Sequence, residues 1–71
     1  MFRIYEVMES RHQRLIGHDA SLPDAIDALY ALAAHRGMDV IAVAADRDFP
    51  GCVDFFAARG TQSLLAHIET E

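Results

Sequence analysis

The feature that most constrains the fold is a run of six apolar residues, Val40 to Ala45, between Asp39 and Asp46. Its Val and Ile side chains favour a β-strand. A strand with one face in water usually alternates apolar and polar residues, whereas a strand covered on both faces is apolar throughout. The run therefore predicts a strand buried on both faces of a sheet.

A helix before this strand is bounded by signals at both ends. Ser21 is a good N-cap, Pro23 suits the first turn, and Gly37 stands where a left-handed C-cap belongs. Between them, apolar residues recur along one helical face: Leu22, Ile26, Leu29 and Ala33. The spacing predicts a helix from about residue 22 to residue 36.

Three further stretches have strand character. Residues 1–8 (MFRIYEVM) and 13–18 (QRLIGH) are separated by a short polar break, which predicts an antiparallel hairpin at the N-terminus. Residues 61–69 (TQSLLAHIE) form the last predicted strand, with Leu64, Ala66 and Ile68 on one face.

The segment CVDFFAARG, residues 52–60, allows two interpretations. As a strand it places Val53 and Phe55 on one face. As a helix over residues 50–59 it has Asp48 as a cap, Pro50 in the first turn and Gly60 as a C-cap, and these flanks favour the helix.

The predicted fold is accordingly a small single α/β (α+β) domain covering residues 1–71, in the order β-β-α-β-α-β. It has the N-terminal antiparallel hairpin and a mixed sheet with two helices. Residues 40–69 would form a right-handed parallel crossover. If residues 50–59 are instead a strand, the order becomes β-β-α-β-β-β.

Composition restricts the partners and the compartment. The chain has 71 residues, and its 11 Asp and Glu against 6 basic residues give a formal net charge of −5. The basic residues are all arginines and are dispersed, which is unlike a nucleic-acid-binding face. We expect no membrane partner, since no apolar run approaches the length of a membrane span. A single cysteine and the absence of a signal-peptide pattern favour the cytoplasm.

The stretch DRDFPGC, residues 46–52, is the main candidate for chemistry. Asp46 and Asp48 can share a hard cation or lie near a phosphate, and Cys52 near a helix N-terminus would gain thiolate character. A tight turn explains the same residues with fewer assumptions. We therefore keep Asp46, Asp48 and Cys52 as ligand-binding candidates and predict no catalytic residue, metal site or cofactor.

Surplus hydrophobicity is the strongest functional signal. If both helices cover the same face of the sheet, the other face is apolar and uncovered, whereas helices on opposite faces would cover both. Interface candidates are Phe2, Ile4, Val43 and Leu65. The sequence predicts a non-catalytic interaction domain, acting as a homodimer or as an accessory subunit of a protein partner. The alternative is a metal- or phosphate-ligand domain, possibly enzymatic, centred on residues 46–52.

Overall fold

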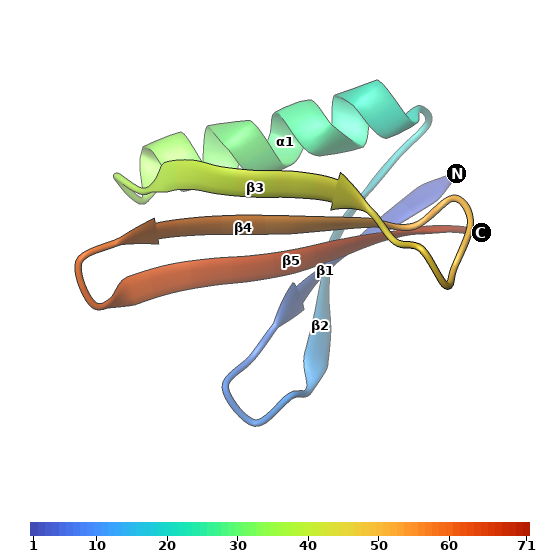
Figure 1. The fold of residues 1–71 in the computed structure, drawn as a ribbon. Coiled ribbons are helices and arrows are strands. Elements are labelled where there is room, and N and C mark those ends of the chain that lie inside the picture. Colours follow the sequence, from blue (N-terminus) through green and yellow to red (C-terminus); the bar gives the residue numbers. More distant parts are fainter.

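The computed structural model describes all of residues 1–71 as one antiparallel sheet with a single helix across one face (Figure 1). In chain order the elements are β1 (Phe2–Val7), β2 (Gln13–Asp19), α1 (Leu22–His35), β3 (Asp39–Ala45), β4 (Val53–Arg59) and β5 (Gln62–Thr70). The mixed α/β class and the N-terminal hairpin are confirmed. The second helix is wrong, and the alternative order β-β-α-β-β-β is the one observed.

The five strands are arranged in the order β2-β1-β5-β4-β3, and every neighbouring pair is antiparallel. The predicted mixed sheet and its parallel crossover over residues 40–69 are therefore wrong. The first and last strands of the chain lie side by side in the middle region, which leaves β2 and β3 as the two edges. In Figure 1 the β1–β2 hairpin turns away from the remaining strands.

Residues 53–59 form a strand because their apolar residues alternate. Val53, Phe55 and Ala57 are 7%, 0% and 0% exposed and face α1, while Phe56 points to the other side of the sheet. Pro50 and Gly60, which favoured a helix, lie in turns instead. Gly51 has φ 84°, and Gly60, with φ 61°, begins the two-residue turn between β4 and β5. Proline and glycine occur at the ends of helices and at the ends of strands, so they did not distinguish the two.

The prediction that Val40 to Ala45 is buried on both faces is also wrong. The run is a strand, but it is an edge strand, and all of its residues except Val40 are exposed. Without a crossover helix after it, β3 pairs only with β4 and has no neighbour on its other side. A bulge displaces Ile41 from the register with β4.

The predicted helix is confirmed as α1, with caps at both ends. The Ser21 hydroxyl accepts a hydrogen bond from the Asp24 backbone amide at 3.2 Å. At the other end the Gly37 amide donates to the Ala34 carbonyl and the Met38 amide to the Ala33 carbonyl. Gly37 has φ 69°, so these bonds form a Schellman motif.

The core lies between α1 and the sheet face that it covers. Its ten buried residues are all apolar: Ile4, Ala25, Leu29, Ala33, Val53, Phe55, Ala57, Leu64, Ala66 and Ile68. α1 contacts β1, β2, β3 and β5 on this face, and the opposite face has no covering element. The helix lacks the length and apolar character that a membrane-spanning helix requires.

Candidate functional site

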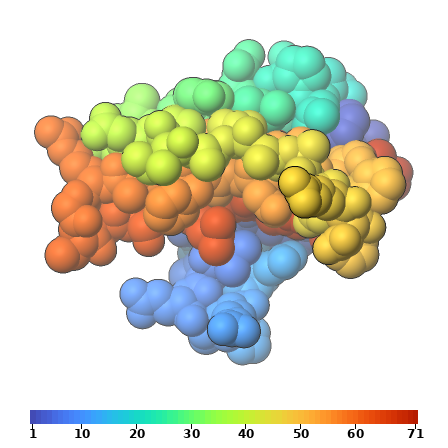
Figure 2. Space-filling view, in the orientation of Figure 1, coloured from blue at the N-terminus to red at the C-terminus, as the bar shows by residue number.

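The outer edge of β3 is an exposed apolar surface. Ile41 is 62% exposed and Val43 is 37% exposed, and no charged residue lies between Asp39 and Asp46. Figure 2 shows the β3 side chains at the molecular surface, between α1 and β4. Backbone amides and carbonyls along this edge have no strand beside them. An uncharged edge of this kind can pair with another strand.

The helix flank above β3 adds to this apolar surface. Val43 stands opposite Phe55 in the sheet, and the Tyr30 ring meets the Phe55 ring edge-on, with their centroids 5.5 Å apart. Tyr30 lies about 100° around α1 from the buried Leu29, so it occupies the flank of the helix. It is 46% exposed. Tyr30, Val43 and Ile41 together define what we call the β3 edge surface.

The uncovered sheet face carries a second, smaller apolar row. Val7 pairs with Leu65, Leu65 with Phe56, and Phe56 with Ala42, so these side chains lie next to one another across four strands. Leu65 is 43% exposed and Phe56 36%. The adjacent row contains polar groups, because His67 stands opposite Asp54. The uncovered face is therefore only partly apolar.

The four predicted interface residues lie in different environments. Ile4 is 3% exposed within the core, and Phe2 is partly buried against it. Val43 belongs to the β3 edge surface and Leu65 to the uncovered face, so these two remain accessible to a partner.

The loop between β3 and β4 uses Asp46 for its own structure. The Asp46 Oδ1 atom accepts a hydrogen bond from the Asp48 backbone amide at 2.9 Å. The Asp46 amide donates to the Cys52 carbonyl at 2.9 Å, and the Cys52 amide donates to the Phe49 carbonyl at 3.1 Å. Asp48 caps no helix, because the next element is the strand β4. The turn predicted for residues 46–52 is thus present, built around an Asx turn at Asp46.

A hollow of about 350 Å³ beside this loop brings together groups that the sequence analysis left apart. It is lined by Gln13, Asp46, Phe49, Cys52, Asp54, His67 and Glu69. The His67 Nδ1 atom is 2.7 Å from Asp54 Oδ1, and its Nε2 atom is 3.4 Å from Glu69 Oε1. Asp48 does not line the hollow. No three His, Cys, Asp or Glu side chains in the structure are arranged to hold a metal ion.

The sequence held a signal for this cluster, but it depended on interpreting residues 53–59 as a strand. In that case Asp54 falls on the same face as Phe56, and antiparallel pairing with β5 brings His67 opposite it. Interpreted as a helix, the same segment gives Asp54 no partner. The cluster was missed because the element type was wrong.

A second charged cluster joins both layers of the fold. Glu6 Oε1 accepts a hydrogen bond from Arg14 at 2.8 Å, and Glu6 Oε2 accepts one from Arg36 at 3.1 Å. The pKa of the Glu6 carboxyl lies below its usual value, mainly because of the hydrogen bond from Arg36. Arg14 acts in the same direction, and partial burial acts against both. Two guanidinium groups share one carboxylate, so the cluster has a net charge of +1.

The sequence contained all three of these residues, but their separation concealed the cluster. Glu6, Arg14 and Arg36 come from β1, β2 and the C-terminal end of α1. Glu6 lies opposite Arg14 in the hairpin register, which the strand prediction did not define. Comparison of the chain with protein-family models, with curated proteins and with solved structures found no significant match.

Proposed function

We propose that this protein is a non-catalytic interaction domain that forms a homodimer by pairing β3 with β3 of a second copy. The observation that supports it is the uncharged, exposed outer edge of β3. Edge strands normally carry charges, prolines or covering elements that prevent such pairing. Residues 40–45 carry neither a charge nor a proline.

Two-fold symmetry suits this edge. Two antiparallel β3 strands related by an axis normal to the sheet bring identical surfaces together, so the contact closes and the assembly stops at two copies. With Ala42 at the axis, Ile41 of each copy lies opposite Val43 of the other. The two sheets then form one continuous sheet, with both helices on the same face.

The flank of α1 enlarges the contact beyond the strand edge. Tyr30 is exposed on the side of the helix that overlies β3, and Val43 lies below it on the same face of the sheet. In the symmetric pair the two Tyr30 rings approach one another over the new strand pair. Aromatic side chains of this kind supply much of the energy of protein interfaces.

The Asp46–Cys52 alternative has weaker support. One Asp46 oxygen is occupied by the backbone of its own turn, and Asp48 lies outside the hollow that Cys52 lines. The proposal places the domain in the cytoplasm, in keeping with its single cysteine, and assigns it neither nucleic acid nor membrane as a partner.

Sedimentation equilibrium at tens of micromolar tests the proposal. Wild type should sediment at twice the chain mass of 7.9 kDa. Ile41→Lys and Val43→Lys should each give the single-chain mass with an unchanged circular dichroism spectrum, because a lysine at the pairing edge must be desolvated on association.

Leu65→Lys and Leu15→Lys are matched controls, because both replace an exposed apolar residue away from β3. They should leave the dimer intact. A wild-type protein that sediments at 7.9 kDa over this range would disprove dimerisation. Dissociation by Leu65→Lys but not by Val43→Lys would instead assign the contact to the uncovered sheet face.

A further inference from the structure

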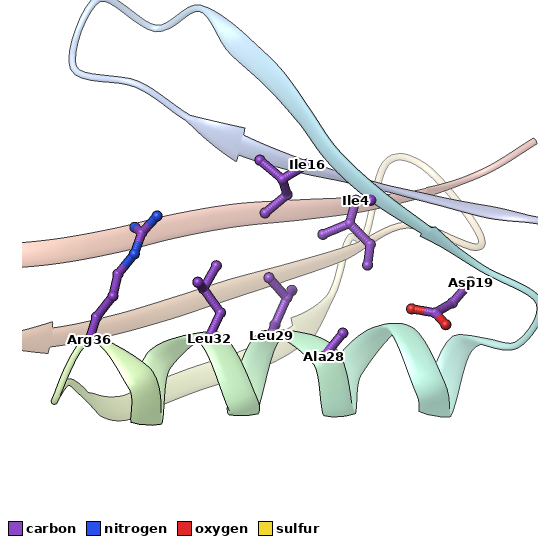
Figure 3. Close-up of a pocket in the computed structure, with 8 residues that line it drawn as sticks. Ile4, Ile16, Asp19, Ala28, Leu29, Leu32 and Arg36 are labelled. Atoms are coloured by element: carbon purple, nitrogen blue, oxygen red, sulfur yellow. The ribbon is translucent and has the colours of Figure 1, made fainter.

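A groove runs along the side of α1 that faces away from β3, between the helix and the β1–β2 hairpin (Figure 3). Its volume is about 310 Å³, at the lower end of the range of small-molecule sites. Ala28 and Leu32 lie on this flank, around the helix from Leu29 in the direction opposite to Tyr30. The groove is therefore separate from the β3 edge surface.

The floor and walls of the groove are apolar. Ile4 and Leu29 are buried at its base, and Ile16, Ala28 and Leu32 form its sides. In Figure 3 the side chains of Leu29 and Leu32 point from the helix toward Ile4 and Ile16 on the strands. An aliphatic chain lying here would exchange water for contact with methyl and methylene groups.

Gly17 keeps the β2 side of the groove open. A Cβ atom at this position would lie 3.8 Å from Ile4 Cδ1, which is an ordinary van der Waals contact. The φ angle of Gly17 is not positive, so the backbone itself does not require glycine here. The absence of a side chain at Gly17 leaves space in the groove. Neither backbone strain nor a close contact explains why a glycine occurs at this position.

The two ends of the groove differ in charge. Arg36 closes one end and Asp19 lies at the other (Figure 3). Arg36 shares the Glu6 carboxylate with Arg14, so this end has a net charge of +1. The bond to Glu6 also holds the guanidinium in place, and its remaining N–H groups can donate to a further acceptor.

We propose that this groove binds a single-headed amphipathic carboxylate, with its carboxylate at Arg36 and its aliphatic chain along Ile4, Ile16 and Leu32. At roughly 30 Å³ per heavy atom, the volume of one water in the liquid, the groove holds about ten heavy atoms. Octanoate has this size. Asp19 repels a second anionic group, so it fixes the direction in which the molecule lies.

Titration calorimetry with octanoate below its micelle concentration tests this inference, with octylammonium and octanol as comparison ligands. Octanoate should bind, octanol should bind about tenfold more weakly because it has no ionic contact, and octylammonium should bind weakest of the three. Equal binding of octanoate and octylammonium would overturn the assignment of Arg36 as the head-group contact.

Two substitutions separate the tail contact from the head contact. Ala28→Phe fills the groove from the exposed side of the helix and should abolish octanoate binding without disturbing the core. Arg36→Gln should weaken it about tenfold, because a charge-assisted bond is lost. Arg47→Gln, on the distant β3–β4 loop, is the control for loss of one surface arginine and should leave octanoate binding unchanged.

Circular dichroism checks that each variant is folded. Octanoate binding that survives Ala28→Phe would place the ligand outside the groove and refute the proposal. The same titrations on the monomeric Val43→Lys protein separate this inference from the proposed dimer. Binding should persist there, because the groove lies on the opposite flank of α1.

Discussion

The two edge strands of the sheet have the same length but differ in their charged side chains. β2 and β3 have seven residues each, and each contains a bulge. On β2, Arg14 bonds to Glu6, and the bulged Ile16 turns toward α1 and lines the groove. On β3 there is no ion pair, and the bulged Ile41 remains 62% exposed.

Both edge strands are held by main-chain pairing with one neighbour, so the difference lies in their side chains. On β2, Arg14 adds an ion pair with Glu6 of β1, which also binds Arg36 at the end of α1, and charges of this kind oppose the approach of another strand. β3 has no ion pair, and its outer side is uncharged between Asp39 and Asp46. We therefore expect substitutions in the β3–β4 loop to weaken the attachment of β3, and substitutions that remove charge to weaken the attachment of β2.

The largest expected effect on the free energy of unfolding comes from a substitution in the loop between β3 and β4. Gly51 has φ 84°, and a Cβ atom there would lie 2.7 Å from Thr70 Oγ1, which donates to the Gly51 carbonyl. Gly51→Ala should reduce the free energy of unfolding by about 2–4 kcal/mol, through backbone strain and this contact. Urea denaturation measures the loss.

Gly60→Ala is the matched control for Gly51→Ala. Gly60 also has a positive φ, 61°, but no atom lies within 4 Å of its Cβ position. It should cost only about 1 kcal/mol, the strain of a left-handed conformation. Equal losses for the two variants would show that the Thr70 contact does not hold the loop.

The second effect concerns the charges that hold β2. Glu6→Gln should reduce the free energy of unfolding by about 1–2 kcal/mol at pH 7, because charge-assisted bonds from Arg14 and Arg36 are weakened. The folded-state pKa of Glu6 is lowered, so its stabilisation is present above the usual Glu pKa of about 4.3 and is lost as the pH falls through the lower folded-state value.

Denaturation of wild type and Glu6→Gln across pH 7 to pH 2 measures this dependence. Other carboxylates titrate in the same range, so the difference between the two proteins isolates Glu6. The difference should shrink toward zero at the acid end. A difference that stays constant with pH would mean that Glu6 contributes through packing rather than through its charge.

Local signals in the sequence predicted local structure well. The cap at Ser21 and the Schellman glycine at Gly37 depend on residues within one turn of the helix, and α1 was found where they indicated. The position of β3 in the sheet depends instead on the type of the next element in the chain. Taking residues 50–59 as a helix implied a parallel crossover, which is wrong, while the predicted burial of β3 on both faces came from its apolar run alone.

The candidate sites were harder to predict for the same reason. The turn at Asp46 is a local feature and was anticipated. The bonds from Arg14 and Arg36 to Glu6 span 8 and 30 residues, and they form only when hairpin register and helix placement are both defined. Hydrophobicity alone did not distinguish a buried strand from an apolar edge, because residues 40–45 satisfy both patterns.

A smaller effect on β3 is expected from its Asx turn. Asp46→Ala removes the acceptor of the Asp48 amide and should cost about 0.5–1 kcal/mol, while Asp46→Asn keeps a side-chain oxygen and should cost less. Thermal melts of the three proteins, with and without millimolar Mg²⁺, measure both effects. A melting temperature that rises with Mg²⁺ only in wild type would instead identify a cation site at this loop.

The smallest expected effect is the salt dependence of the β3 pairing. In a symmetric pair centred on Ala42, Asp39 of one copy lies near Asp46 of the other at both ends of the contact. These exposed like charges oppose association weakly, so raising NaCl from about 0.05 M to about 0.5 M should tighten the dimer about twofold. Sedimentation over this range measures the dissociation constant.

Asp39→Asn should tighten the dimer at low salt and remove most of the salt effect. If that variant retains the full salt dependence, the repulsion arises from the overall net charge of −5 and not from the ends of β3.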